Sequence, residues 1–128
     1  MCRMIATAPE ATGDGDRQTQ LLRGALDMCL LALLAKEPAH GYDLVRRFEA
    51  SGLEAVGYGT IYPLLTRMRR LGLVADELQA SPTGPPRKVY ALTDAGRSRL
   101  NAWHQQWTQF VDVVTAILPD PVPDHPRS

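Results

Sequence analysis

The stretch YGTIYPLLTRMRRLGLV, residues 58–74, decides the fold that the sequence predicts. Its large apolar side chains recur at three- and four-residue spacing, which places them on one stripe of an α-helix. Pro63 is compatible with a helix that begins between Gly57 and Thr60, because amide groups of a first turn have no partner inside the helix. Gly72 then ends the helix. The stripe turned toward a core consists of Ile61, Leu64, Leu65, Met68 and Leu71.

The opposite face of the same helix is basic, and the stretch contains no acidic residue. Arginines on this face can pair with phosphate oxygens or guanine edges, and tyrosine and threonine hydroxyls can contact phosphate. The alternative is an ordinary solvated cationic surface, which many helices have. The face consists of Gly59, Tyr62, Pro63, Thr66, Arg67 and Arg70, with Arg69 on its flank.

Two helices are expected upstream of this stretch. Apolar periodicity predicts the first over residues 19–36 and the second within HGYDLVRRFEASG, residues 40–52, where Gly52 suits the C-terminal cap. Arg46 and Arg47 fall on the polar face of the second helix. Two interpretations stay open for this arginine pair, contact with a flanking DNA backbone or simple solvation.

Two strands are predicted downstream, over residues 73–79 and 87–92. The joint between them, ASPTGPP, is so rich in proline and glycine that we expect a stiff loop and not a tight two-residue turn. Thr93 can cap a final helix, and Asp94 in its first turn suits the helix dipole.

The predicted order is therefore helix, helix, helix, strand, strand, helix. This order is typical of a mainly α (α+β) fold, the winged helix-turn-helix, whose third helix enters the major groove of DNA. The wing, over about residues 80–88, carries Arg87 and Lys88, which suit backbone phosphate or a minor groove. Cations on both the third helix and the wing favour nucleic acid over a merely solvated surface.

Composition sets bounds that agree with this fold. The 128 residues suffice for one domain, with zero formal net charge. Residues 17–99 hold twelve Lys/Arg against eight Asp/Glu, a net of +4. No apolar run approaches the roughly 20 residues that span a bilayer, and the two cysteines indicate no disulfide framework. We therefore expect a cytoplasmic protein that has no membrane partner.

Four motifs in this order resemble the PadR family of bacterial transcriptional regulators. They are LLRGALDMCLLALL, HGYDL, GTIYPLLTRMRRLGLV and GPPRKVYALTDAG, and the resemblance runs from about residue 20 to residue 118. It implies a homodimeric DNA-binding repressor of the family's short type, with a single dimerisation helix after the wing. Two-fold symmetry then predicts a palindromic operator with half-sites roughly 10 base pairs apart. The sequence departs from the family at VGYG, residues 56–59, where a serine-like capping residue usually precedes the glycine.

The recognition helix, over about residues 58–72, and the wing supply the predicted DNA contacts. Tyr42 joins them because its hydroxyl, at the start of the second helix, can lie near DNA. The candidate DNA-binding residues are Tyr42, Tyr58, Gly59, Thr60, Tyr62, Pro63, Thr66, Arg67, Arg70, Arg87 and Lys88.

The final helix carries the pattern of a dimer seam. Six apolar residues recur at spacings of 3, 4, 3, 4 and 3, which is too short for an independent coiled coil but sufficient for a dimer contact. The same side chains can instead pack within one chain, although a monomer has little to cover two tryptophans. The predicted interface residues are Leu100, Trp103, Trp107, Phe110, Val114 and Ile117.

Domain boundaries follow from these assignments. We expect a flexible N-terminal tail over residues 1–18, a winged helix-turn-helix DNA-binding domain over 19–93, a dimerisation helix over 94–118 and a Pro-rich flexible tail over 119–128.

The two tryptophans of the seam suggest a second role for the final helix. Resemblance to drug-sensing members of the family implies a small planar aromatic effector stacked on this helix at the dimer centre. Trp103 and Trp107 are the candidate ligand-binding residues, and Trp107 is the better match. The alternative is that both are interface anchors, a role in which tryptophan is enriched.

Catalysis and metal binding find little support in the sequence. His40, His104 and His125 lack ligand spacing, and no glycine-rich phosphate loop or nucleophile elbow occurs. We therefore expect no enzyme activity, no metal site and no cofactor. The alternative function, from another class, is a winged-helix protein-interaction module without sequence-specific DNA binding.

Overall fold

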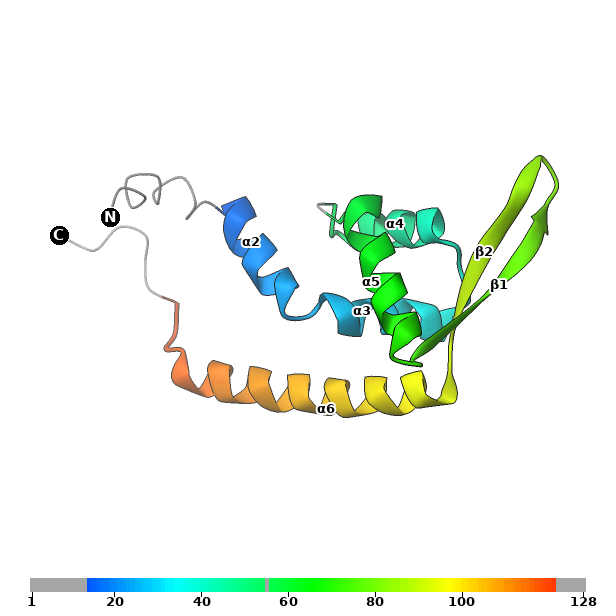
Figure 1. The fold of residues 1–128 in the computed structure, drawn as a ribbon. Coiled ribbons are helices and arrows are strands. Elements are labelled where there is room, and N and C mark those ends of the chain that lie inside the picture. Colours follow the sequence, from blue (N-terminus) through cyan, green and yellow to red (C-terminus); the bar gives the residue numbers. More distant parts are fainter. Residues whose placement is uncertain (1–13, 55, 122–128) are drawn as a thin grey trace, which may run out of the picture.

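The computed structural model describes residues 14–54 and 56–121. Three helices pack around a small core, a two-stranded hairpin projects from it, and a long final helix runs along the opposite side (Figure 1). The predicted winged helix-turn-helix with a long C-terminal helix is confirmed. In chain order the elements are α2 (Asp14–Arg23), α3 (Leu26–Lys36), α4 (Gly41–Ala50), α5 (Tyr58–Arg70), β1 (Val74–Ser81), β2 (Gly84–Leu92) and α6 (Asp94–Ile117).

The core lies between α3, α4, α5 and the base of the hairpin. Burial of large apolar side chains is the dominant favourable term in folding, and this cluster supplies it. Its largest fully buried members are Phe48, Leu30, Leu31, Leu44, Ile61, Leu65, Met68, Leu73 and Val74.

The predicted apolar stripe of α5 is wrong at its last member, because Leu71 is 54% exposed. The helix ends at Arg70, so the helical period no longer sets the direction of the next side chain. Gly72 has a φ of 79°, a left-handed conformation that favours glycine. This turn redirects the chain, and Leu73 and Val74 enter the core in place of Leu71.

The first predicted helix, over residues 19–36, is wrong as a single element. The chain forms α2 and α3 with a two-residue break at Gly24 and Ala25. Glycine costs about 1 kcal/mol relative to alanine inside a helix, which makes this the weakest point of the segment. Residues 14–18, which were included in the predicted N-terminal tail, belong to α2. Residues 1–13, and residues 122–128 of the predicted C-terminal tail, lie outside the described residues.

The wing is longer and tighter than predicted. β1 and β2 pair antiparallel from Val74 with Leu92 to Ser81 with Gly84, so only two residues form the turn. The expected stiff loop over 80–86 is therefore wrong. Pro85 and Pro86 fall where the register shifts between Gln79 and Ser81, a position that requires no paired amide from a proline.

Two contacts fix the wing and α6 to the core. Ala39 exchanges both backbone hydrogen bonds with Tyr90, at 3.0 and 2.8 Å, and so forms an isolated antiparallel β-bridge with β2. The Thr93 cap is confirmed: its hydroxyl accepts from the Gly96 amide at 3.0 Å and donates to the Gly72 carbonyl at 2.7 Å. Among the described residues, no helix combines the length and the apolar character needed to cross a lipid bilayer.

Candidate nucleic-acid interface

The backbone hydrogen bonding of α5 is interrupted near the N-terminal end of the helix. Gly57 is the N-cap and has no side chain to cap the helix, in line with the departure noted in the sequence. Ile61 donates to the Gly57 carbonyl at 3.1 Å, so regular bonding starts there. Pro63 lies in the second turn, later than predicted, and cannot donate to the Gly59 carbonyl. Gly59 is exposed, which leaves this carbonyl open to solvent.

Three tyrosines from α4 and α5 form a stacked cluster at this end of the domain. The rings of Tyr42 and Tyr58 are nearly parallel, with centroids 4.4 Å apart, and the Tyr62 ring lies 5.7 Å from Tyr58. Tyr42 and Tyr62 are exposed, whereas Tyr58 is half-buried. Burial, and then its two tyrosine neighbours, raise the pKa of Tyr58. Gly41 permits the packing, since a Cβ there would lie 2.6 Å from Cε1 of Tyr58.

The three arginines of α5 differ in what neutralises them. Arg67 and Arg70 are exposed, and neither forms an ion pair with any residue of 14–54 or 56–121. Arg69, on the flank, places its Nε 4.0 Å from Oδ2 of Asp76. Thr66 is only half-exposed. The exposed members of the predicted face are Gly59, Tyr62, Pro63, Arg67 and Arg70, and the candidate DNA-binding residue Thr60 beside them is exposed as well.

The two wing cations lie on opposite faces of the hairpin, as expected for neighbouring residues of a strand. Arg87 places Nη1 3.2 Å from Nε2 of His40, in the connection before α4. Lys88 places Nζ 3.6 Å from Oδ2 of Asp76, in β1. Each cation is thus linked to a different part of the domain.

Sequence reasoning missed both partners of these cations. It considered His40 as a metal ligand and set it aside, whereas His40 is the N-cap of α4 and its Nδ1 accepts from the Asp43 amide at 3.3 Å. The position directly before GYDL, at a helix start, was the available signal. Asp76 gave no signal, because its contact with Lys88 depends on the register of the two strands.

The open question on the second helix is answered for Arg47, which packs against its own chain. Its guanidinium donates to the carbonyls of Leu33, Glu37 and Pro38 at 3.4, 2.9 and 3.3 Å. These carbonyls lie at the C-terminal end of α3, where helical groups lack intrahelical partners. Arg46 is exposed and pairs with Asp43 at 2.7 Å.

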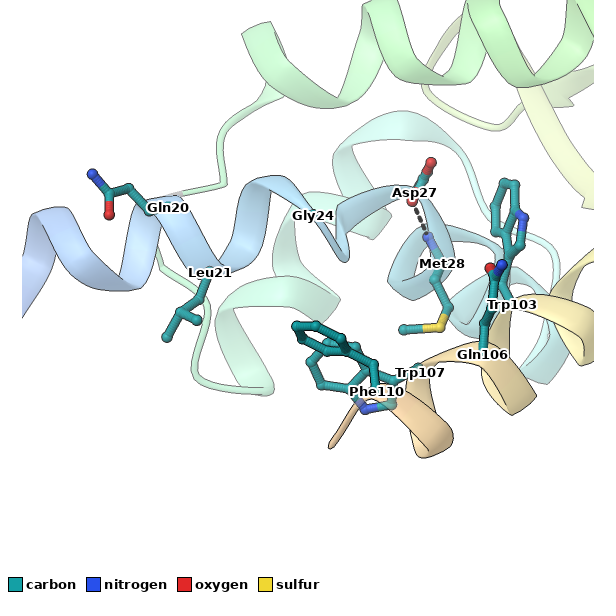
Figure 2. A pocket seen from close by; sticks show the side chains of 9 residues that line it. All are labelled: Gln20, Leu21, Gly24, Asp27, Met28, Trp103, Gln106, Trp107 and Phe110. Carbon is teal, nitrogen blue, oxygen red and sulfur yellow. Dashed lines mark hydrogen bonds between the residues drawn. The ribbon is translucent and has the colours of Figure 1, made fainter. Parts of the chain in front are cut away.

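A groove with a volume of about 740 Å³ lies between the α2–α3 junction and α6 (Figure 2). Met28 lines it from α3, Leu21 from α2, and Trp103, Trp107 and Phe110 from α6. The rings of Trp107 and Phe110 lie 6.3 Å apart. The groove is thus mostly apolar and contains both tryptophans.

The predicted dimer seam on α6 divides into two parts. Leu100 and Trp103 are half-buried against the core of their own chain. Farther along, Trp107, Phe110 and Ile117 are exposed, and Val114 is half-exposed. The second half of α6 therefore presents apolar side chains that the described chain leaves mostly uncovered.

Comparison with known proteins connects this geometry to one family. The family model described as Transcriptional regulator PadR-like family matches residues 30–102 of this chain. The negative transcriptional regulator PadR of Bacillus subtilis is 30% identical over 80 residues, which cover 61% of this chain and 44% of that protein. The chain spans less than half the length of the curated relatives it matches.

Solved structures extend the likeness over nearly the whole fold. A PadR-like transcriptional regulator from Bacillus cereus is 36% identical, with a TM-score of 0.72 over 80% of this chain and 99% of that chain. A PadR family transcriptional regulator from Eggerthella lenta is 34% identical, with a TM-score of 0.76 over 84% of this chain and 93% of that chain.

Proposed function

This chain belongs to the PadR-like family of transcriptional regulators, and from this premise we propose that it is a homodimeric repressor that binds double-stranded operator DNA. In the proposed complex α5 enters the major groove, and the wing contacts the backbone or minor groove beside it. The observation that carries the proposal is the face of α5 on which Arg67 and Arg70 are exposed and unpaired within the described chain.

Different parts of α5 have different roles in this proposal. In helix-turn-helix proteins the N-terminal residues of the recognition helix contact base edges. Thr60 and Tyr62 lie at that end, with Tyr42 and Tyr58 beside them. At 1.5 Å per residue, Arg67 is about 14 Å from Tyr58 and about 10 Å from Thr60 along the helix axis, toward the C-terminal end of α5. We therefore assign Arg67 and Arg70 to phosphate and the tyrosine end to bases.

The exposed apolar stripe on the second half of α6 supports the homodimer. A patch of this kind on a soluble protein usually marks an interaction surface. A two-fold dimer held there carries two copies of α5 and requires a palindromic operator, with half-sites roughly 10 base pairs apart.

A planar aromatic effector is a second element of the proposal, and the groove beside α6 supports it. Trp107 is 41% exposed there and has Phe110 as a neighbouring ring, so a flat molecule can stack on it. Trp103 packs against the core and suits an anchoring role.

The alternative, a winged-helix protein-interaction module, predicts that the arginine face is dispensable. Unpaired arginines that project from a recognition helix argue against it, because a phosphate backbone neutralises such charges most directly.

Arg67→Ala combined with Arg70→Ala tests the function. With duplex DNA from directly upstream of the gene encoding this chain, we expect a loss of affinity at low salt and a salt slope smaller by about two, since each phosphate contact contributes about 0.9. Arg17→Ala combined with Arg23→Ala, on the distant α2, removes the same charge, is the matched control and should bind like the wild type. Salt-independent binding of the wild type, or full binding by the double variant, would refute the proposed function.

A further inference from the structure

A single carboxylate lies between a wing cation that the proposed function assigns to DNA and Arg69, on the flank of the basic face of α5. Asp76 in β1 places Oδ2 3.6 Å from Nζ of Lys88 and 4.0 Å from Nε of Arg69. Across residues 14–54 and 56–121, no other acidic side chain pairs with a cation of α5 or the wing. Asp76 is 18% exposed, whereas both cations are about half-exposed. The carboxylate is held at the base of the wing while the cations still reach solvent.

The register of the hairpin explains this placement. Asp76 pairs with Tyr90, and Leu78 pairs with Lys88, so Asp76 and Lys88 are diagonal neighbours on one face of the hairpin. This is the face on which Tyr90 is buried, next to the end of α5 that carries Arg69. Asp76 therefore meets one cation from the recognition helix and one from the wing.

We propose that Asp76 competes with DNA phosphate for Lys88 and Arg69, and so lowers the affinity of this regulator for DNA of any sequence. This inference rests on the DNA binding proposed above. An exposed ion pair contributes little to stability, so both cations can exchange the carboxylate for a phosphate. The phosphate then lies beside the largely buried carboxylate, and repulsion between the two anions weakens the contact.

The consequence is largest for non-specific complexes. Backbone contacts are the same at every site, whereas base contacts form only at the operator. A regulator with weakened phosphate contacts depends more on the base contacts of α5 and dissociates sooner from unrelated DNA.

Glu77 is a matched control within the same strand. It is one residue away, so its side chain lies on the opposite face of the hairpin, where its register partner is Val89. It is exposed, and within the described chain it forms no ion pair. Glu77→Gln and Asp76→Asn remove the same charge at nearly the same distance from the wing tip.

The test is binding of the full chain to a labelled duplex of unrelated sequence between 50 and 200 mM salt, a range over which phosphate contacts change affinity strongly. We expect Asp76→Asn to bind roughly fivefold more tightly, from one like-charge contact near the surface. The salt slope should increase by about 0.9, because the variant neutralises one more phosphate. Glu77→Gln should change affinity by less than about twofold, as expected for a screened charge. With Lys88→Gln already in place, the gain from Asp76→Asn should shrink.

The possible results of this binding experiment test the role of Asp76 and the proposed DNA binding separately. Equal gains in Asp76→Asn and Glu77→Gln would mean a net-charge effect and would overturn the inference, as would weaker binding by Asp76→Asn. Asp76→Ser repeats the test with a smaller polar side chain, and failure of both variants to fold would assign Asp76 a structural role instead. If the wild type binds no DNA at any salt concentration, the proposed function itself fails, whereas salt-dependent wild-type binding with no gain in Asp76→Asn removes only the inference.

Discussion

Ile61 and Ile117 are the same residue type on apolar stripes of the same helical spacing, yet Ile61 is 0% exposed and Ile117 is 74% exposed. The two exposures differ because the rest of the described chain packs against α5 but not against the second half of α6. α5 lies between α3, α4 and the hairpin, so its stripe faces a closed core. α6 has 24 residues and is about 36 Å long, which carries its second half past that core (Figure 1). Periodicity thus identifies an apolar stripe without identifying what covers it.

The largest expected effect on stability comes from the comparison of alanine substitutions at Ile61 and Ile117. Ile61→Ala should lower the free energy of unfolding by about 3 kcal/mol, because it leaves a cavity in a close-packed core. Ile117→Ala should change it by less than about 0.5 kcal/mol at low protein concentration. Denaturant unfolding of both variants at several protein concentrations measures the difference.

The concentration dependence sharpens the comparison further. If a second chain covers α6, the cost of Ile117→Ala should grow as protein concentration rises, whereas the cost of Ile61→Ala should not. A cost for Ile117→Ala that is independent of concentration would contradict the homodimer through this face.

A smaller effect is expected at the point where α6 leaves the core. Gly96 is buried, and a Cβ there would overlap the Leu73 carbonyl oxygen. Gly96→Ala should therefore cost roughly 2 kcal/mol of unfolding free energy through overpacking. Gly59→Ala is the control, because a Cβ at Gly59 meets open space and should stabilise α5 by up to about 1 kcal/mol. Equal effects of the two variants on the thermal midpoint would show that α6 is not held at Gly96.

The smallest effect on stability is expected at Trp107, where the readout is fluorescence. A panel of planar aromatic compounds should quench tryptophan emission in the wild type and in Trp103→Ala but not in Trp107→Ala. The reason is that Trp107 is the more exposed of the two tryptophans that line the groove. If no compound of the panel quenches the emission, the proposed effector is contradicted. If quenching persists in Trp107→Ala, the ligand binds at a site other than Trp107.

Local signals in the sequence predicted much of the fold. The stripe of Ile61, Leu65 and Met68, the Thr93 cap and the turn at Gly72 each depend on residues within a few positions of one another. The order of elements then limited the fold to a winged helix.

What the sequence did not predict depends on contacts between distant segments. The link from Asp76 to Lys88 and Arg69 requires the strand register, and the link from Arg87 to His40 joins positions 47 residues apart. The tight wing turn was missed because the prolines were assigned to a loop, whereas Pro85 and Pro86 occupy a register shift inside the hairpin. The sequence therefore indicated cations for the proposed interface, but not the neighbours of these cations within the chain.

Thr93 alone connects β2 to α6, and it is hydrogen-bonded at once to Gly72 and Gly96. Leu100 and Trp103 also pack the first half of α6 against the core, so a change in helix angle concerns the part beyond Trp103. The 14 residues from Trp103 to Ile117 span about 21 Å, over which a tilt of about 5° displaces the far end by about 2 Å. A small change in the angle of α6 thus gives a larger displacement toward its C-terminal end. The α5 face and the distal part of α6 are connected through the contacts of Thr93 with Gly72 and Gly96.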